Sequence, residues 1–267
     1  MTTKIQKARS VFISDVHLGF KGCQAESLLH FLQSIETEYL FLVGDIVDFW
    51  SLKRSPHWPQ EHTSVIRSIL NKAKHNTKVI YIPGNHDAVM RDYVGSVFGN
   101  LEIHQDYVHT TAANKKLLVM HGDEFDMIVK HSKLLAHLGS FAYETLLDLN
   151  YYVNGLRKLF NRSHWSLAAY VKNKVKNAVD YIGNFENAVA HLAKERKVDG
   201  VVCGHIHHAE IRDINGILYC NDGDWVESCT SLIEHPDGRL ELLRWNEVYE
   251  KSSFTKLEEL FEIDKAA

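Results

Sequence analysis

Short runs of apolar residues, rich in β-branched and aromatic side chains, recur along the chain. Runs of this length and composition are typical of strands that are buried on both faces. The strands predicted on this basis are Val11–Ser14, Tyr39–Val43, Lys78–Ile82, Leu117–Met120 and Asp199–Cys203.

Two stretches between the first three strands, Ala25–Ile35 and Thr63–Lys74, instead repeat their apolar residues at helical spacing. Strands that alternate with helices in this way indicate a parallel α/β sheet. Further β-rich tracts cover Tyr107–Met120 and Ala209–Trp245, and the second of them contains turn signals at Asn215-Gly216 and at residues 236–238. We therefore expect an α/β fold with two sheets packed as a sandwich and helices outside.

An insertion interrupts this pattern between His121 and His205, which are separated by 83 residues. A crossover between parallel strands needs only about a dozen residues. Apolar residues recur at helical spacing over residues 134–149 and 167–182, which indicates helices. The predicted organisation is a core of residues 1–123 and 198–246, a helical cap insertion of residues 124–197, and a C-terminal tail of residues 247–267.

The composition narrows the classes of function. Of 267 residues, 45% are hydrophobic and 24% charged, as in globular proteins. No stretch approaches the roughly 18 apolar residues that a membrane span needs, and a net charge of -4 argues against a general nucleic-acid-binding protein. Four cysteines without a Cys-x-x-Cys pair, and no apolar leader, lead us to expect a reduced, cytoplasmic protein. The unusual count is 17 histidines, since histidine is the commonest metal ligand.

A cluster of carboxylate, amide or imidazole side chains follows each of the five predicted strands. Ligands of open α/β sheets bind outside the carboxyl ends of the strands, so these clusters can converge on one site. One such cluster alone is ordinary turn chemistry, whereas five in order at strand ends are hard to explain as turns. The clusters are Asp15-x-His17, Gly44-Asp45, Gly84-Asn85-His86-Asp87, His121-Gly122-Asp123 and Gly204-His205-x-His207.

This set of ligands mixes oxygen with imidazole nitrogen and contains no thiolate, which favours manganese, iron or zinc over magnesium or calcium alone. Seven candidate ligands exceed what one ion with an open position can use, so we predict two divalent ions, manganese first, with one bridging carboxylate. Two metals about 3.5–4 Å apart suit phosphoester hydrolysis, because they clamp the phosphoryl oxygens and activate water. The candidate ligands are Asp15, His17, Asp45, Asn85, His121, His205 and His207.

In this order the five motifs resemble those of the calcineurin-like metallophosphoesterase superfamily, and the resemblance covers residues 10 to 245. It implies a metallophosphoesterase-type four-layer α/β/β/α sandwich with a dinuclear centre. It further implies that Asp45 bridges the metals, that His86 donates a proton to the leaving group, and that Asp87 holds His86. The remaining ligands implied are Asp15, His17 and His207 for one metal and Asn85, His121 and His205 for the other.

Within the superfamily, the chain resembles the UDP-2,3-diacylglucosamine pyrophosphohydrolases of lipid A synthesis. The resemblance lies in Trp50 after the second motif, in the sequence GHIHH at residues 204–208 and in the long insertion after His121. The best-known members have arginine in place of His86 and glutamate in place of Asp48, so the match is to the wider family or to a second subgroup. The resemblance implies hydrolysis of the pyrophosphate of a nucleotide-linked lipid sugar.

The predicted cap insertion carries six cations and no acid between residues 151 and 178. A solvated helix face explains this charge run equally well. Large apolar side chains lie among the cations, as on surfaces that meet phosphate and acyl chains together, which extends the expectation to a peripheral contact with the inner face of the membrane. The residues expected to contact the substrate are Trp50, Arg157, Lys158, Trp165 and Lys172.

Alternatives remain open at this stage. The sequence Asp222-Gly223-Asp224-Trp225 could reach the site, but a β-turn also accounts for it. A phosphodiesterase acting on cyclic nucleotides or nucleic acid needs no acyl pocket and is the second hypothesis for function. A metal-loaded scaffold without catalysis ranks last, because His86 and the full set of ligands are present.

Overall fold

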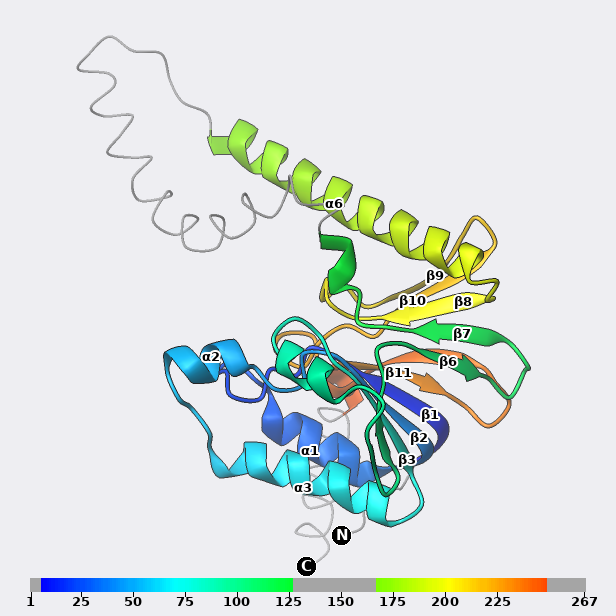
Figure 1. Ribbon diagram of the computed structural model, residues 1–267. Coiled ribbons are helices and arrows are strands. Elements are labelled where there is room, and N and C mark those ends of the chain that lie inside the picture. The colour runs from blue at the N-terminus through cyan, green and yellow to red at the C-terminus, as the bar shows by residue number, and fades with distance from the viewer. Residues whose placement is uncertain (1–5, 127–166, 249–267) are drawn as a thin grey trace, which may run out of the picture. The chain divides into compact units, whose positions relative to one another are not determined.

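The computed structural model describes residues 6–126 and 167–248 of the chain (Figure 1). The chain divides into two compact units, which are described separately: residues 1–123 with 190–267, and residues 124–189. All of the predicted metal ligands belong to the first unit.

The first unit contains a seven-stranded sheet in the order β12-β11-β1-β2-β3-β5-β4. The neighbours β1, β2, β3 and β5 run parallel, and the remaining pairs are antiparallel. The parallel arrangement of the first three strands confirms the prediction from the alternating pattern. The strands are β1 (Gln6–Ile13), β2 (Ile35–Val43), β3 (Lys78–Ile82), β4 (Val97–Phe98), β5 (Leu101–Ile103), β11 (Thr230–Glu234) and β12 (Leu240–Arg244).

A second sheet of five strands has the order β6-β7-β8-β10-β9. Its central strands β7, β8 and β10 run parallel, and the edge strands β6 and β9 are antiparallel to their neighbours. The turn at Asn215-Gly216 joins β9 to β10, as the sequence predicts. The strands are β6 (Tyr107–Thr110), β7 (Lys116–Val119), β8 (Gly200–Cys203), β9 (Glu210–Ile214) and β10 (Ile217–Asn221).

The two sheets pack face to face around an apolar core. Phe12 of β1 and Phe41 of β2 stack with ring centroids 4.6 Å apart, and both are completely buried. They belong to the same core cluster as Leu117 of β7 and Val202 of β8, so side chains from both sheets fill the space between them. Successive side chains of a strand point to opposite faces of the sheet. The alternate residues of β1 and β2 therefore pack into a second core on the other face of the seven-stranded sheet.

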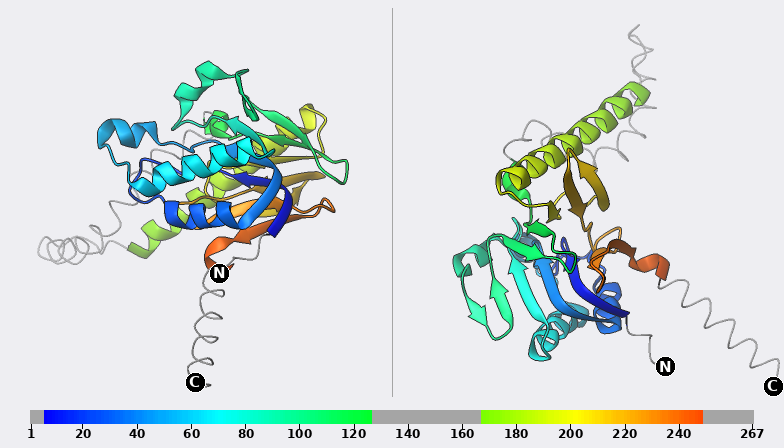
Figure 2. Two further views of the ribbon diagram at one scale, coloured as in Figure 1. Left: turned by 90° about the horizontal axis from the view of Figure 1, so that it is seen from below. Right: turned by 90° about the vertical axis from the view of Figure 1, so that its right-hand side faces the viewer.

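That second core lies under two helices, α1 (Ala25–Ser34) and α3 (Gln60–Lys74), which Figure 2 shows side by side over the outer face of the seven-stranded sheet. Val11 and Leu40 point toward these helices and are fully buried. Both helices match predicted helical stretches. The α/β sandwich of two sheets is therefore the predicted fold class.

Two short helices follow the second and third motifs, α2 (Phe49–Arg54) and the 3-10 helix η1 (Ala88–Tyr93). The sequence pattern does not predict them, because six residues are too few to display a helical period. Each of these two helices begins within a few residues of a candidate ligand.

The long helix α6 (Leu167–Glu195) contains the predicted helical stretch at residues 167–182. In the second unit, Phe125 at the end of η2 (Asp123–Phe125) meets Phe185 of α6 edge to face, with ring centroids 6.1 Å apart. The predicted helical stretch at residues 134–149 lies outside the described residues, so the boundaries of the cap insertion stay a prediction. Among the described residues, no helix is both long and apolar enough to cross a membrane.

Candidate metal centre

The predicted ligands lie in loops at the carboxyl ends of β1, β2, β3, β7 and β8, and backbone hydrogen bonds tie these loops together. Asp15 N donates to Gly44 O at 3.1 Å, which joins the loops after β1 and β2. Gly204 N donates to His121 O at 3.2 Å, which joins the loops after β8 and β7. His205 N donates to Asp15 Oδ2 at 2.8 Å and so connects the two sheets. The five motifs therefore converge, as the order of the strands predicts.

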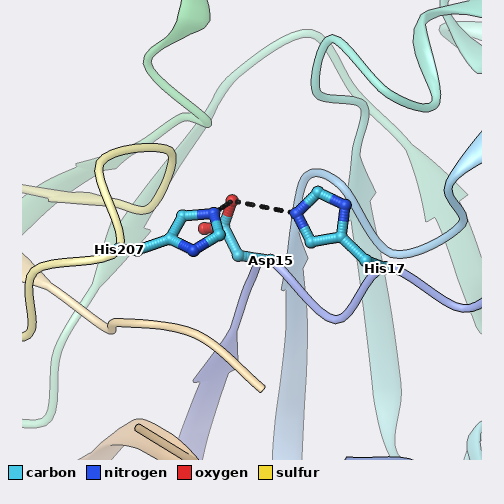
Figure 3. Close-up of side chains that lie close together, drawn as sticks. All are labelled: Asp15, His17 and His207. Atoms are coloured by element: carbon cyan, nitrogen blue, oxygen red, sulfur yellow. Dashed lines mark ion pairs between the residues drawn. The ribbon is translucent and has the colours of Figure 1, made fainter. Parts of the chain in front are cut away.

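Asp15, His17 and His207 form the first cluster (Figure 3). Asp15 Oδ1 lies 3.1 Å from His207 Nε2 and 3.9 Å from His17 Nε2. Their three ligand atoms lie within 4.8 Å of one another, a spacing that allows one ion to bind all three.

A second cluster contains Asp45, His121 and His205, again with ligand atoms within 4.8 Å of one another. Asp45 Oδ2 lies 3.4 Å from His121 Nε2 and 4.0 Å from His17 Nε2 of the first cluster. Asp45 therefore stands between the two clusters, in the position that a bridging carboxylate requires.

Several buried atoms of this site have no hydrogen-bond partner among the described residues: Asp15 Oδ1, His17 Nε2, Asn85 Oδ1 and His121 Nε2. Buried polar atoms in folded proteins are nearly always paired, because an unpaired one loses its hydration without compensation. All four are atoms that can donate a lone pair to a metal ion. The donor set thus fits a pair of divalent cations.

The opposite nitrogens of two histidine rings are held by the surrounding structure. His121 Nδ1 donates to Val43 O at 2.8 Å, and His17 Nδ1 lies 3.3 Å from Asp48 Oδ2. Fixing Nδ1 in this way leaves Nε2 as the free lone pair that faces the cluster, the arrangement typical of metal-binding histidines.

Opposite charges dominate the electrostatics of the cluster. Burial opposes ionisation of Asp15, but His207, His121 and His17 hold the pKa of its carboxyl far below the ordinary value. Burial likewise opposes a charge on His121, yet Asp45 and Asp15 raise its pKa to about 10. Without metal, a proton on His121 thus balances the charge of the two carboxylates, and a divalent cation would take its place.

The backbone at five of the seven candidate ligands adopts the left-handed conformation, with φ from 50° to 71°. Non-glycine residues with positive φ carry strain, and such strain concentrates at functional sites. The five residues and their φ values are Asp15 (50°), His17 (54°), Asp45 (53°), His205 (71°) and His207 (53°).

Glycines of the motifs make the close approach of these loops possible. A Cβ atom at Gly44 would collide with the His121 ring, and one at Gly84 would collide with Asp45 Oδ1. A Cβ atom at Gly204 would collide with Ser14 Oγ and Asp15 Oδ2. The Gly-Asp, Gly-Asn-His-Asp and Gly-His motifs therefore begin with glycine for a steric reason.

His86 lies beside the clusters, with Nδ1 3.0 Å from Asp48 Oδ1. Burial lowers the pKa of His86, but the hydrogen bond with Asp48 and the charges of Asp45 and Asp48 outweigh it and raise this pKa. The same Asp48 carboxylate accepts hydrogen bonds from Ser51 N and Oγ at 2.7 and 2.8 Å, which fixes it at the start of α2. Asp48 thus orients both His17 and His86.

The expectation that Asp87 holds His86 is wrong. The Asp87 carboxylate is fully buried and accepts hydrogen bonds from Gly84 N at 2.6 Å, Ile46 N at 2.8 Å and the Tyr81 hydroxyl. It therefore joins the loops after β2 and β3, and the carboxylate beside His86 is Asp48. The sequence marks Asp48 only as a difference from relatives, because the spacing of residues along the chain does not show that Asp48 lies next to His86 in the fold.

The predicted substrate contacts fall in different regions. The Trp50 ring lies over His86 with centroids 4.2 Å apart, and 58% of its surface is exposed, so a substrate could reach it. Arg157, Lys158 and Trp165 lie outside the described residues, as does the side chain of Lys172 in α6.

Residues 222–225, for which the sequence allowed either a place at the site or a turn, form a turn and also contact the site. Asp224 Oδ1 accepts hydrogen bonds from Val226 N and Glu227 N, as expected of a turn. Asp222 lies behind Asp15, linked to it through Ser14.

Comparison with known proteins adds a family and several distant relatives. The family model of the calcineurin-like phosphoesterases matches residues 8–209. A UDP-2,3-diacylglucosamine hydrolase of Aliivibrio fischeri is 24% identical over 250 residues, covering 85% of this chain and 94% of that protein. A DNA polymerase II small subunit of Thermoplasma acidophilum is 24% identical over 240 residues, covering 80% of this chain and 44% of that protein.

Other matches are partial or structural. A UDP-2,3-diacylglucosamine hydrolase of Blochmanniella pennsylvanica is 25% identical over 116 residues, covering 42% of this chain and 46% of that protein. The chain thus matches less than half the length of this relative and of the Thermoplasma protein. Among solved structures, an archaeal phosphodiesterase is 12% identical with a TM-score of 0.43, covering 88% of this chain and 98% of that chain.

Proposed function

Because this chain belongs to the calcineurin-like phosphoesterase family, we propose that it hydrolyses a phosphoric anhydride or phosphodiester with the help of two divalent metal ions. The observation that carries the proposal is the meeting of two ligand clusters at Asp45, where buried atoms that can bind a metal lack a hydrogen-bond partner among the described residues.

Each residue has a distinct part in the proposed reaction. Asp45 would be shared by both ions. When bound, the ions would polarise the phosphoryl oxygens and lower the pKa of the attacking water, and manganese is the first candidate on the basis of the donor set. The other ligands would be Asp15, His17 and His207 for one ion and Asn85, His121 and His205 for the other.

His86 is the proposed general acid. Asp48 holds Nδ1 of the ring, which leaves Nε2 to donate a proton to the leaving oxygen. The pKa of His86 is raised above its ordinary value, which favours the protonated form that a general acid requires. Trp50 packs against the ring, with centroids 4.2 Å apart.

Exposed apolar side chains next to the site support a substrate with a lipid part. They lie in the loops, the short helices and the edge strand β4 that follow the first three motifs, within fifteen residues of a candidate ligand along the chain. Large apolar residues on a protein surface commonly mark a binding surface when they gather in this way. They are Phe20, Phe49, Trp50, Val89, Tyr93, Val94, Val97 and Phe98.

The charges of α2 and the loop after it support a contact with an anionic lipid surface. Residues 49–58 contain no acid, and Lys53 and Arg54 are exposed beside Trp50 and Trp58. Tryptophan and basic residues together are typical of membrane interfaces. With the relatives named as UDP-2,3-diacylglucosamine hydrolases, this favours a nucleotide-linked lipid sugar as the substrate, taken from the inner face of the membrane.

A substrate panel tests this proposal. The full chain loaded with Mn²⁺ is incubated with UDP-2,3-diacylglucosamine, with the UDP-sugar that lacks acyl chains, and with cyclic nucleotides and single-stranded nucleic acid. We expect release of UMP from the acylated substrate at a higher kcat/KM than from the unacylated one. Hydrolysis restricted to cyclic nucleotides or nucleic acid would establish the phosphodiesterase hypothesis instead, and no hydrolysis of any substrate would favour the scaffold.

A further inference from the structure

A buried carboxyl group, Asp222, lies at the carboxyl end of β10 behind the candidate metal ligands. Its side chain is completely buried, and Asp222 Oδ1 lies 2.6 Å from Ser14 Oγ. Ser14 Oγ in turn lies 2.6 Å from Asp15 Oδ2. Two carboxyl groups therefore share one hydroxyl group at short hydrogen-bond distance.

Counting protons shows that one of these carboxyl groups is neutral. The Ser14 hydroxyl has a single hydrogen atom and three neighbouring oxygens, Asp15 Oδ2 and Asp222 Oδ1 at 2.6 Å and the Gly223 carbonyl oxygen at 3.2 Å. Each of the two 2.6 Å contacts needs a hydrogen atom between its oxygens, so one hydroxyl hydrogen does not suffice. A carboxyl group must supply the other. Asp15 Oδ2 already accepts a hydrogen bond from His205 N at 2.8 Å and so acts as an acceptor. The second hydrogen atom therefore belongs to Asp222.

The surroundings of the two carboxyl groups agree with this assignment. Asp15 has His17 and His207 within 4 Å, and these rings stabilise its negative charge. Asp222 Oδ2 has no hydrogen-bond partner among the described residues, which would be costly for an ionised oxygen. Burial and the nearby charge of Asp15 hold the pKa of Asp222 well above its ordinary value.

The end of β10 is itself held in place against the fifth motif. Asn221 Nδ2 donates to Gly204 O at 2.8 Å, and Asn221 Oδ1 accepts from Gly223 N at 3.0 Å. Gly204 has no room for a Cβ atom beside Ser14 and Asp15. These contacts fix the position of the backbone from which the Asp222 side chain reaches Ser14.

We propose that Asp222 is a positioning residue for the metal centre: as a neutral acid it donates a hydrogen bond to Ser14, whose hydroxyl donates to Asp15 Oδ2. This chain of hydrogen bonds fixes the Asp15 carboxylate so that Oδ1, which is buried, faces His17 and His207. Asp222 acts through a hydrogen bond and adds no negative charge to the site. The inference rests on the proposed function, since it assigns Asp15 to metal binding.

Two variants of Asp222 separate a hydrogen-bond donor from a negative charge. In Asp222→Asn the amide nitrogen can donate to Ser14 Oγ, so we expect the affinity for Mn²⁺, measured by electron paramagnetic resonance of the free ion, to stay close to that of the wild type. In Asp222→Ala and in Ser14→Ala the chain is cut, and Mn²⁺ should bind about 10- to 100-fold more weakly, as for other residues that orient metal ligands. Asp213→Asn, which removes a charge from an exposed position of β9, should have no effect.

A second measurement tests the proton directly and needs no metal. Infrared difference spectra of the chelated full chain should contain the carbonyl band of a protonated carboxylic acid that is missing in Asp222→Asn. Loss of Mn²⁺ affinity in Asp222→Asn equal to that in Ser14→Ala, or absence of the band, would overturn the proposal. If the wild type binds no Mn²⁺, the proposed function fails, whereas the infrared band still decides the state of Asp222.

Discussion

His86 stands where the best-known members of the family that the sequence resembles have arginine, and two contacts hold its imidazole ring. Asp48 binds Nδ1, and Trp50 packs against the ring. Asp48 is shorter than the glutamate expected at its position and reaches both His17 and His86 while it caps α2. His86 and Asp48 thus contact each other at the two positions where the best-known relatives have arginine and glutamate.

His86→Asn tests the role of the imidazole. Loss of a general acid should lower turnover by about 10²- to 10⁴-fold, because the leaving oxygen then departs without a proton. The loss should be smaller for p-nitrophenyl phosphodiesters, whose leaving group is a weak base, than for alkyl phosphodiesters. Metal content, measured by mass spectrometry, should remain that of the wild type. Equal losses for both classes of substrate would assign His86 to positioning of the phosphoryl group.

Asp45→Asn and Asp15→Asn compare a shared ligand with one that belongs to a single cluster. Asp45 lies near His17 of one cluster and His121 of the other, so its replacement should weaken both ions. Asp15→Asn should weaken one ion only, and Mn²⁺ titration should then show one tight site. The same metal stoichiometry and affinities in both variants would contradict a bridging role for Asp45.

The grouping of the candidate ligands could be predicted from the sequence because each motif is local and stands directly after a strand. The roles of Asp48, Asp87 and Asp222 could not. Asp87 and Asp48 occupy similar positions in neighbouring loops, and only the path of the backbone decides that one binds amides and the other an imidazole. Asp222 is far from Asp15 in sequence and reaches it only because β10 runs parallel to β8.

At the scale of elements, a buried polar cluster joins the two sheets at the end opposite the metal centre. Glu234 of β11 accepts hydrogen bonds from Ser10 Oγ of β1 at 2.6 Å and from Arg9 at 2.9 Å. His109 of β6 lies 2.7 Å from the same carboxylate. The cluster connects three strands from two sheets, so it should stabilise the sandwich without contacting the site.

Glu234→Gln should change how stability depends on pH. Burial raises the pKa of Glu234, but the bonds from His109, Ser10 and Ala112 N outweigh it and lower the pKa from 4.5 to about 2. A depressed carboxyl pKa stabilises the fold above pH 4.5, and this stabilisation is lost as the pH falls toward 2. The difference in free energy of unfolding between wild type and Glu234→Gln, from urea denaturation, should therefore shrink over this range. A difference that stays constant with pH would show that the Glu234 charge contributes nothing.

The periodicity of apolar residues in the sequence predicts the long helices and strands of the core, but it does not predict the short ones. Strand β1 and helix α3 span enough residues for their buried faces to repeat in the sequence. The two residues of β4 and the six of α2 form because neighbouring segments hold them, and they have no periodic pattern of their own. Together with the 3-10 helix η1, these two elements carry most of the exposed apolar side chains that follow the first three motifs.

For the whole molecule, these apolar side chains predict binding to a lipid surface. Val97 and Phe98 are 63% and 62% exposed, and burial of a phenylalanine side chain in lipid contributes about 1.5–3 kcal/mol. The double variant Val97→Ser with Phe98→Ser should therefore bind anionic phosphatidylglycerol vesicles at least about tenfold more weakly in a flotation assay. Activity on an aryl phosphodiester should stay unchanged.

Leu70→Ser is the matched control for this experiment, because Leu70 is 53% exposed on α3, away from the motifs. Replacing Lys53 and Arg54 with glutamine should reduce binding to anionic vesicles and leave binding to neutral vesicles unchanged. If the wild type does not float with vesicles of either composition, the apolar surface serves a protein partner or the substrate alone.

The left-handed backbone at five candidate ligands limits which side chains could replace them if the metal preference of the proposed centre were redesigned. Aspartate, asparagine and histidine tolerate positive φ better than other non-glycine residues, whereas a β-branched residue there is a genuine outlier. A library that varies positions 15, 17, 45, 205 and 207 over all amino acids would therefore consist mostly of chains that fold poorly, whatever their affinity for metal. Exchanges among aspartate, asparagine and histidine would sample new coordination chemistry at little cost in backbone strain.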